Sequence, residues 1–305
     1  MRVNFNRILR RYGRLSVEKL LIVGCGDLGR RLARRLDPAA FEVHGLRRSD
    51  TALPAPIHAV SGDVSERAPT AALLRREAYD VVVATLTPDA RSDTGYRRAY
   101  VDTMTVLTSE LAALSHPPRL VIFVSSTSVY GQNAGEWVDE SAPTRPQSFS
   151  GRRLLEAERC LLDSGLPGCV VRFSGIYGRG RARLVQQVRD GAGACQAPPQ
   201  YSNRIHAEDC AGVLQHLMAL SRRPGSLAPV YVASDCDPAP LWDVKQWLAG
   251  RLGLPPDHLQ PSASRGQGKR CSNRLLLSTG YRFQYPDYRS GYGAELDESQ
   301  NPRSP

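Results

Sequence analysis

Lysine is nearly absent from this chain of 305 residues. Only Lys19, Lys245 and Lys269 occur, and all the other basic residues are arginine. The long interval between Lys19 and Lys245 therefore excludes a lysine amine as a catalytic group in most of the chain.

Long apolar runs and paired cysteines are missing as well. No stretch approaches the roughly 18 apolar residues that span a bilayer. The arginine-rich residues 1–16 lack the apolar segment of a secretory signal. We interpret them as a basic N-terminal extension, with a transit peptide or a misplaced start codon as alternatives.

None of the seven cysteines forms a C-x-x-C pair, which argues against a disulfide framework and a zinc site. We expect no metal, no membrane partner and a cytoplasmic, reducing location.

The formal net charge is +10 and the isoelectric point is about 9.5. Such a balance is common in proteins that bind nucleic acid. Here the arginines are scattered among acidic residues, and no zinc-finger, RNA-recognition or basic-zipper pattern occurs. We therefore expect no nucleic-acid partner, and we expect part of the excess charge to serve an anionic cofactor or substrate.

Short apolar runs alternate with helical patterns in the first half of the chain. Runs that are apolar on both faces predict a parallel sheet covered by helices on both sides. Residues 17–178 are predicted to form an α/β dinucleotide-binding domain with a doubly wound, Rossmann-type parallel sheet. Residues 179–294 are predicted to form a smaller C-terminal α+β substrate lobe, and residues 295–305 a disordered tail.

The predicted strands are Lys19–Val23, Phe41–Leu46, Ile57–Ser61, Val81–Thr85, Arg119–Ser125, Cys169–Phe173, Val230–Val232 and Tyr281–Phe283. The predicted helices are Asp27–Leu36, Ala71–Glu77, Tyr96–Leu114, Gly151–Leu162, Asp209–Leu220 and Leu241–Leu252.

The first apolar run leads into the pattern G-x-G-x-x-G. Gly24 permits a tight turn, Gly26 lets the backbone approach a pyrophosphate, and Gly29 lets the next helix pack close to the sheet. Asp27 and Leu28 open that helix, whose N-terminus offers free N–H groups to phosphates. A strand before the pattern and a helix after it predict dinucleotide binding. The alternative is a glycine turn that serves packing alone.

The second predicted strand is followed by Arg47 and Arg48. Sites that prefer NAD place an acidic residue about 20 residues after the glycines, where it binds the ribose hydroxyls. Arg47 occupies that position. A guanidinium cannot accept those hydroxyl protons, but its forked donors suit a 2′-phosphate. We therefore favour NADP(H) over NAD(H). The alternative is that both arginines point into solvent at a charged strand end.

Further candidate cofactor contacts follow the third and fourth predicted strands. Asp63, with Val64 beside it, is placed to receive the adenine amino group. Ala84, Thr85 and Leu86 would line the cofactor at the end of the fourth strand. Because Asp and Thr are ordinary loop residues, local turn roles are the alternative.

Four motifs in order carry a family resemblance. Val124–Gly131 resembles the fifth-strand motif of extended short-chain dehydrogenases/reductases, the family of NAD(P)-dependent epimerases and dehydratases. Asp139–Pro143 resembles the following D-E-x-x-P loop, and Val171–Gly178 the sixth-strand R-x-x-x-I-Y-G element. Asn203–Asp209 resembles the N-x-I-H-x-x-D segment of the substrate lobe. The match runs from about residue 19 to residue 292.

The resemblance implies a hydroxyl that polarises the substrate carbonyl, a tyrosine acid/base and a lysine that lowers the tyrosine pKa. Ser126 matches the hydroxyl, with Ser125 placed at the cofactor and Thr127 at the substrate. The tyrosine position falls on Ser150 and the lysine position on Leu154. The chain is thus identified as an atypical member. Cofactor binding is implied, whereas the usual proton relay is not.

Other residues are candidates for the missing roles. Tyr130, four residues past Ser126, is a candidate acid/base, with packing as its alternative. Tyr177, Arg204 and His206 lie on segments that border the substrate cleft in relatives, so we predict that they bind substrate. The forked donors of Arg204 match phosphate oxygens, and the alternative for His206 is to orient a loop.

Two functions remain open. The first is an NAD(P)-dependent oxidoreductase or epimerase-like protein, acting on a small carbonyl compound or a nucleotide-linked sugar with an altered proton donor. The second is a non-catalytic sensor that binds NADP(H). We favour the enzyme, because the substrate-side motifs survive. The substrate is expected to be a small molecule, with an anionic one included. A homodimer stays open because two-helix dimers are common among relatives.

Overall fold

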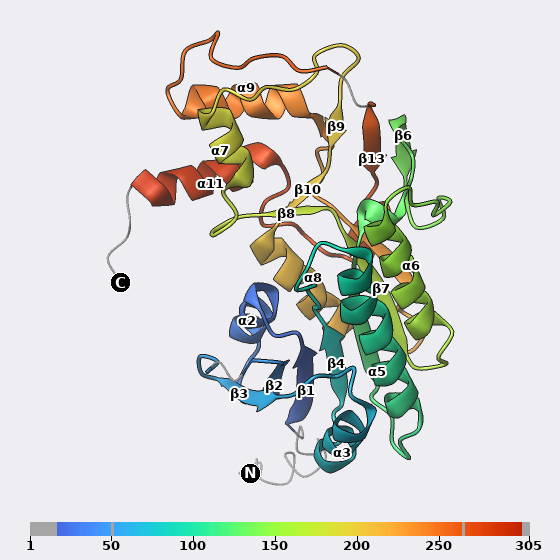
Figure 1. Cartoon of the computed structure of the whole chain (residues 1–305). Helices are drawn as coiled ribbons and strands as arrows, with labels where there is room; N and C mark the ends of the chain where they lie inside the picture. The colour runs from blue at the N-terminus through green and yellow to red at the C-terminus, as the bar shows by residue number, and fades with distance from the viewer. Residues whose placement is uncertain (1–16, 50–51, 264–265, 301–305) are drawn as a thin grey trace, which may run out of the picture.

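The computed structural model describes residues 17–49, 52–263 and 266–300 (Figure 1). The predicted extension at residues 1–16 lies outside these ranges. A seven-stranded parallel sheet in the order β11-β7-β5-β4-β1-β2-β3 forms the centre. The predicted Rossmann-type sheet is thereby confirmed. Its strands are β1 (Glu18–Val23), β2 (Phe41–Arg47), β3 (Ile57–Ser61), β4 (Val81–Ala84), β5 (Leu120–Ser126), β7 (Gly168–Phe173) and β11 (Val230–Ala233).

The strands are apolar on both faces because helices cover both sides of the sheet. In β1, Leu20 and Ile22 pack on the α2 and α8 side, whereas Leu21 and Val23 pack on the α3, α5 and α6 side. Alternate residues of a strand point to opposite faces, so one continuous apolar run supplies two cores. The helices of these two layers are α2 (Asp27–Arg35), α8 (Ala207–Leu220), α3 (Arg67–Glu77), α5 (Thr103–Ala112) and α6 (Phe149–Leu162). Before α5 the predicted helix Tyr96–Leu114 is interrupted, because α4 (Asp93–Tyr96) continues into the π-helical turn η1 (Arg97–Asp102).

A smaller lobe lies above the sheet in Figure 1 and has a core of its own. Its helices are α7 (Arg183–Arg189), α9 (Leu241–Arg251) and α11 (Tyr288–Gln300). The short helix α10 (Arg274–Ser278) packs instead on β11 of the main sheet, where Leu276 belongs to the main core. Three two-stranded sheets connect the smaller lobe to the main domain: β8 (Gly175–Tyr177) with β10 (Arg204–His206), β9 (Tyr201–Ser202) with β12 (Ala239–Pro240), and β6 (Ala134–Val138) with β13 (Gly268–Cys271). The 3-10 turn η2 (Thr127–Val129) follows β5.

The predicted boundary at residue 178 needs correction. β11 pairs with β7 at the edge of the main sheet, and α8 packs on α2. Residues 207–233 therefore continue the βα alternation of the main domain. The composition changes after residue 178 because the chain leaves the sheet there, but it later returns to it.

Two further predictions for the C-terminal part were wrong. Residues 295–300 belong to α11 rather than to a disordered tail, and Leu296 is buried in the core of the smaller lobe. Tyr281–Phe283 forms no strand, because the Tyr281 hydroxyl and the following backbone bond to the Asp209 carboxylate instead. Within the described ranges, no helix is long and apolar enough to cross a membrane.

The packing of α11 depends on a glycine. A Cβ atom built on Gly291 would lie 1.8 Å from the Tyr177 hydroxyl oxygen, which is buried without a hydrogen-bond partner among the described residues. A Cβ atom on Gly293, in the same helix, would come no nearer than 3.9 Å, to a Trp247 ring atom. Only Gly291 is therefore required by close approach.

This difference predicts opposite effects of two alanine substitutions. Alanine is a better helix former than glycine by about 1 kcal/mol, so Gly293→Ala should raise the free energy of unfolding by up to that amount. Gly291→Ala should lower it by about 1 to 3 kcal/mol, because the methyl group overpacks Tyr177. Urea unfolding of both variants measures the pair. Effects of the same sign would contradict this packing.

Candidate cofactor and active site

The glycine turn after β1 has the geometry that a dinucleotide cradle requires. Gly24 has a φ of +74°, and a Cβ atom there would lie 3.0 Å from the Thr85 carbonyl oxygen. A Cβ atom on Gly29 would lie 2.8 Å from an Ile22 methyl group, so the glycine lets α2 approach β1 closely. A Cβ atom on Gly26 would meet only the Gly24 carbonyl oxygen, at 3.8 Å. The turn thus has no room for side chains on the side of the sheet but leaves space at Gly26, as a bound diphosphate needs.

Ion pairs join the start of α2 to Arg181 of the smaller lobe and to α8 of the main domain. Asp27, the first residue of α2, pairs with Arg31 at 3.1 Å and with Arg181 at 3.4 Å. Arg31 also contacts Glu208 at the start of α8. Burial tends to raise the pKa of Asp27, but the two guanidiniums hold it below its usual value. Asp27 therefore stays ionised, and its charge is compensated beside the free helix N–H groups.

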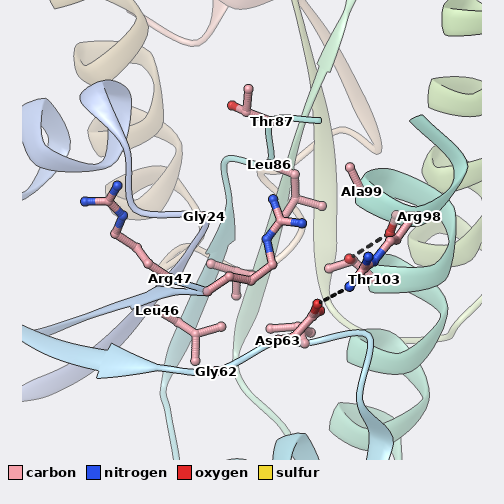
Figure 2. A pocket seen from close by; sticks show the side chains of 13 residues that line it. Gly24, Leu46, Arg47, Gly62, Asp63, Leu86, Thr87, Arg98, Ala99 and Thr103 are labelled. Carbon is pink, nitrogen blue, oxygen red and sulfur yellow. Dashed lines mark hydrogen bonds and ion pairs between the residues drawn. The ribbon is translucent and has the colours of Figure 1, made fainter. Parts of the chain in front are cut away.

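A hollow lies at the carboxyl ends of β1 to β4, next to the glycine turn. This is the switch point of the strand order, where ligands of doubly wound sheets bind. Figure 2 shows side chains from strand ends and from η1 around it. The hollow has a volume of about 430 Å³. It is lined by Val23, Gly24, Leu46, Arg47, Arg48, Gly62, Asp63, Val64, Leu86, Thr87, Arg98, Ala99 and Thr103. Of the predicted cofactor residues, the structure brings Gly24, Arg47, Arg48, Asp63, Val64 and Leu86 together here.

The two arginines at the end of β2 differ in their contacts. Arg48 forms a bidentate ion pair with Asp89. Arg47 is half-buried, and its guanidinium makes no hydrogen bond or ion pair within residues 17–49, 52–263 and 266–300, whereas its backbone carbonyl oxygen accepts the Gly62 N–H at 2.9 Å. Figure 2 shows its guanidinium extended beside Gly24. Arg47 thus keeps all its donors for a ligand, whereas those of Arg48 are partly occupied.

Asp63 is held by partners that its sequence position did not predict. It accepts hydrogen bonds from the Ser65 backbone and side chain, and it pairs with Arg98 of η1 at 3.0 Å (Figure 2). Burial tends to raise the pKa of Asp63, but Ser65 and Arg98 lower it below the usual value. Asp63 is therefore an ionised acceptor at the edge of the hollow.

The other two predicted residues of the fourth strand end act on the turn itself. The Thr85 hydroxyl donates to the Gly24 carbonyl oxygen at 2.9 Å. Ala84 is fully buried in the sheet. Thr85 supports the glycine turn through this hydrogen bond and Ala84 through its position in the sheet. Neither residue lines the hollow.

Ser126 is the last residue of β5 and is half-buried. Its oxygen accepts the Ser128 backbone N–H at 3.1 Å, so its own hydroxyl hydrogen remains able to donate. Ser150 bonds to Ser148 at the start of α6, and Leu154 is buried in the core below that helix. The positions of the usual tyrosine and lysine thus carry no phenol and no charge.

A buried polar network lies behind Ser126. Ser125 points away from the crevice and donates to Glu158 of α6 at 2.6 Å. Glu158, fully buried, pairs with Arg172 of β7, which donates to the Tyr130 hydroxyl at 2.8 Å. The Tyr130 hydroxyl in turn donates to the Asp139 carbonyl oxygen at 2.7 Å. Burial raises the pKa of Tyr130 to about 12.

These contacts correct two predictions. The Ser125 hydroxyl serves Glu158 rather than the cofactor. The Tyr130 ring packs under the Arg172 guanidinium, its hydroxyl is engaged on both sides, and its raised pKa makes it a poor base near neutral pH. The structure therefore gives Tyr130 the packing role that was its alternative.

The predicted substrate residues are also internal. Thr127 is buried, and its hydroxyl tends to lower the pKa of the Cys271 thiol. Tyr177 stacks on Tyr292 inside the smaller lobe. Arg204 is buried, and it donates to the carbonyl oxygens of residues 202 and 237. These three side chains hold the lobe together and do not face an open cleft, contrary to the prediction.

His206 is a helix-capping residue. Its Nδ1 accepts the Glu208 N–H at 3.2 Å, and its Nε2 lies 2.9 Å from Glu295 of α11. It therefore caps α8 and joins that helix to α11, which is neither the predicted substrate contact nor the orientation of a loop. In the part of the chain that the structure describes, no cluster of three or more His, Cys, Asp or Glu could hold a metal ion.

A second, larger hollow lies between the loop at residues 178–182, α7 and α11. Its wall carries the guanidinium groups of Arg179, Arg181 and Arg189. Glu295 and Glu298 of α11 contribute carboxylates, and Tyr292 an aromatic ring. Sequence reasoning missed this hollow and the Arg98 contact, because both depend on elements far apart in the chain. The arginine-rich composition of residues 179–189 was the one available signal.

Comparisons with known proteins agree with this geometry. Residues 20–220 match the model of the NAD dependent epimerase/dehydratase family. The chain belongs to that family. It is 31% identical over 292 residues to Protein YeeZ of Escherichia coli strain K12, covering 89% of this chain and 97% of YeeZ.

Solved structures show the same fold. A Methylobacillus flagellatus protein, described as a candidate NAD-dependent epimerase/dehydratase, is 36% identical with a TM-score of 0.77. The match covers 94% of this chain and 100% of that one. Human epimerase family protein SDR39U1, solved with NADPH, is 19% identical with a TM-score of 0.72, covering 92% and 99% of the two chains. At that identity the likeness shows the fold alone.

The buried network predicts a large effect of one neutral substitution. Glu158→Gln removes the charge that faces Arg172, and breaking a buried ion pair costs about 3 to 5 kcal/mol. The matched control is Glu156→Gln, two residues earlier in α6, where an exposed pair with Arg153 is lost. That change should cost about 0.5 kcal/mol or less. Chemical unfolding of both variants measures the difference, and equal losses would refute this account of the network.

Proposed function

We propose that this chain is an NADP(H)-dependent oxidoreductase or epimerase that acts on the carbonyl group of a small anionic compound, such as a nucleotide-linked sugar. The observation that carries the proposal is the hollow at the switch point of the sheet, between the glycine turn and Arg47. A nicotinamide cofactor that lay along this edge would extend from the Arg47 end toward Ser126 at the end of β5.

The residues present fit such a cofactor. The open side of Gly26 and the N-terminus of α2 suit a diphosphate. Asp63 is an ionised acceptor where an adenine amino group is expected. Among fold neighbours, human SDR39U1 was solved with NADPH, and the UDP-glucuronic acid 4-epimerase of Bacillus cereus, at 17% identity, with NAD. When bound, the cofactor would supply or accept the hydride.

The preference for NADP(H) rests on Arg47. Its guanidinium lines the hollow, no carboxylate of the described residues neutralises it, and its forked donors match a phosphate. A ribose without the 2′-phosphate would leave the Arg47 guanidinium without an anionic partner. Arg48 contributes less, because Asp89 already occupies its donors.

Ser126 is proposed to orient the substrate. Its hydroxyl hydrogen can donate to a carbonyl oxygen while the Ser128 N–H fixes the position of its own oxygen. Such a donor stabilises the negative charge that develops on that oxygen when hydride adds to the carbon. The substrate's anionic group is assigned to the arginine-lined hollow, where Arg179 and Arg189 form no ion pair with another described residue.

A non-catalytic sensor is the second candidate function. The buried Leu154 and the short side chain of Ser150 favour it, because neither can replace a phenol or an ammonium. The half-buried Ser126, with a hydrogen free to donate, favours the enzyme. Turnover decides between the two candidates, as the second test below specifies.

The cofactor preference is tested by titration with NADPH and NADH. Wild-type protein should bind NADPH at least about tenfold more tightly, which corresponds to about 1.4 kcal/mol from charge-assisted contacts with Arg47. Arg47→Asp should remove that preference, whereas Arg48→Ala should retain most of it. Equal wild-type affinities for the two cofactors, measured by calorimetry, would refute the assignment.

Catalysis is tested by following NADPH absorbance with a library of small carbonyl compounds and nucleotide-linked sugars. We expect turnover of at least one compound, and a loss of about 100-fold in kcat for Ser126→Ala, because an oxyanion donor is removed. Thermal melting of the variant controls for its folding. Bound NADPH without turnover across the library would favour the sensor.

A further inference from the structure

One lysine, from a distant segment of the chain, lies close to the turn after Ser126, whereas the lysine that the family resemblance implies is missing. Lys269 of β13 places its Nζ 3.2 Å from the Tyr130 carbonyl oxygen, at the end of the turn η2 that follows Ser126. The backbone of β13 is fixed there by Asn203. Its side-chain nitrogen donates to the Lys269 carbonyl oxygen at 2.8 Å, and its side-chain oxygen accepts the Cys271 N–H at 2.7 Å.

The direction of the lysine side chain follows from its hydrogen bond. The register of β13 is irregular between Gly268 and Arg270, so the alternation of faces does not fix this direction. The Lys269 ammonium donates to the Tyr130 carbonyl oxygen, whereas Arg270 lies over the rings of Trp137 and Tyr201. The Lys269 ammonium therefore lies at the end of the turn that follows Ser126.

The hydrogen bonds of Lys269 are incomplete. An ammonium group has three N–H donors, and in the described structure the Lys269 ammonium has one acceptor, the Tyr130 carbonyl oxygen. Lys245 shows the satisfied arrangement, because it is buried and bonds to two carbonyl oxygens, those of Ala192 at 2.7 Å and Gly193 at 2.8 Å. A half-buried donor with unused capacity beside a candidate site requires an explanation.

We infer that Lys269 is the acid group of this cleft and takes the place of the absent tyrosine and lysine. In the reducing direction, a bound reduced nicotinamide would supply the hydride that the substrate carbon gains. The substrate oxygen forms an O–H bond as one N–H bond of the Lys269 ammonium breaks, and the amine regains its proton from water. This inference rests on the proposed function, because it requires the substrate carbonyl at Ser126.

The environment of the lysine suits this role. Burial lowers the pKa of Lys269, and the Cys271 thiol opposes this shift. A lowered pKa brings an ammonium closer to the range in which it gives up a proton. Arginine, which supplies every other positive side chain except Lys19 and Lys245, stays protonated and offers no such step.

The scarcity of lysine makes a direct test practicable. Reductive methylation with ¹³C-formaldehyde should give three lysine side-chain signals besides the amino terminus, and Lys269→Arg and Lys245→Arg variants assign two of them. NADPH should shift the Lys269 signal and slow its modification at least about threefold, while Lys245 remains unchanged. Calorimetry on the same unmodified protein reports cofactor binding independently. Binding without any effect on Lys269 overturns the lysine assignment alone, whereas no binding overturns the proposed function and this inference together.

A second test separates catalysis from folding. With a compound that wild-type protein turns over, Lys269→Ala should lower kcat about 100-fold or more while the Kd for NADPH stays within about threefold. Added ethylamine should restore part of the rate, since a free amine can occupy the space left by the side chain. Lys245→Ala is the matched control and should show no amine rescue. A Lys269→Ala variant that folds and keeps its rate, or that ethylamine does not rescue, refutes the role of Lys269 as an acid.

Discussion

The close approach of α2 to β1 is the constraint on which the rest of the site depends. Gly29 has no room for a side chain against Ile22, and Gly24 adopts a backbone conformation that other residues rarely adopt. Together they place the N-terminus of α2 directly above the end of β1. The strand order of the sheet then brings the ends of β2, β3 and β4 around the same point. The glycine pattern therefore fixes the position of the α2 N-terminus relative to the ends of these four strands.

The second organising feature is the charge buried behind Ser126. Glu158 and Arg172 join α6 to β7, and Ser125 and Tyr130 complete their hydrogen bonds. Because Ser125 and Ser126 are neighbours in β5, their side chains point to opposite faces of the strand, and the network holds the Ser125 hydroxyl. The residues at the predicted tyrosine and lysine positions, Ser150 and Leu154, carry no phenol and no ammonium, while this network is buried beside β5.

The fold and the glycine turn were predictable from sequence because they depend on local patterns. Strands buried on both faces are continuous apolar runs, and seven of the eight predicted strands occur in the sheet within one residue of their expected bounds. Tyr177, Arg204 and His206 were misassigned for a physical reason. Polar side chains in family motifs indicate a cleft only if they remain accessible, and here α11 covers them. The Asp63–Arg98 pair and the arginine-lined hollow join distant segments, so no local pattern could indicate either.

The rarity of lysine has a different meaning once the structure is known. Arginine can perform the surface and ion-pair roles of lysine in this chain, since those roles require only a permanent positive charge and forked donors. The buried Lys245 and the half-buried Lys269 occur in places where a guanidinium would not serve in the same way. Lys245 fits between two carbonyl oxygens as a compact cation. Lys269 lies against the turn after Ser126 with donors to spare. A composition that replaces lysine almost everywhere else thus points to positions where a compact or titratable amine is required.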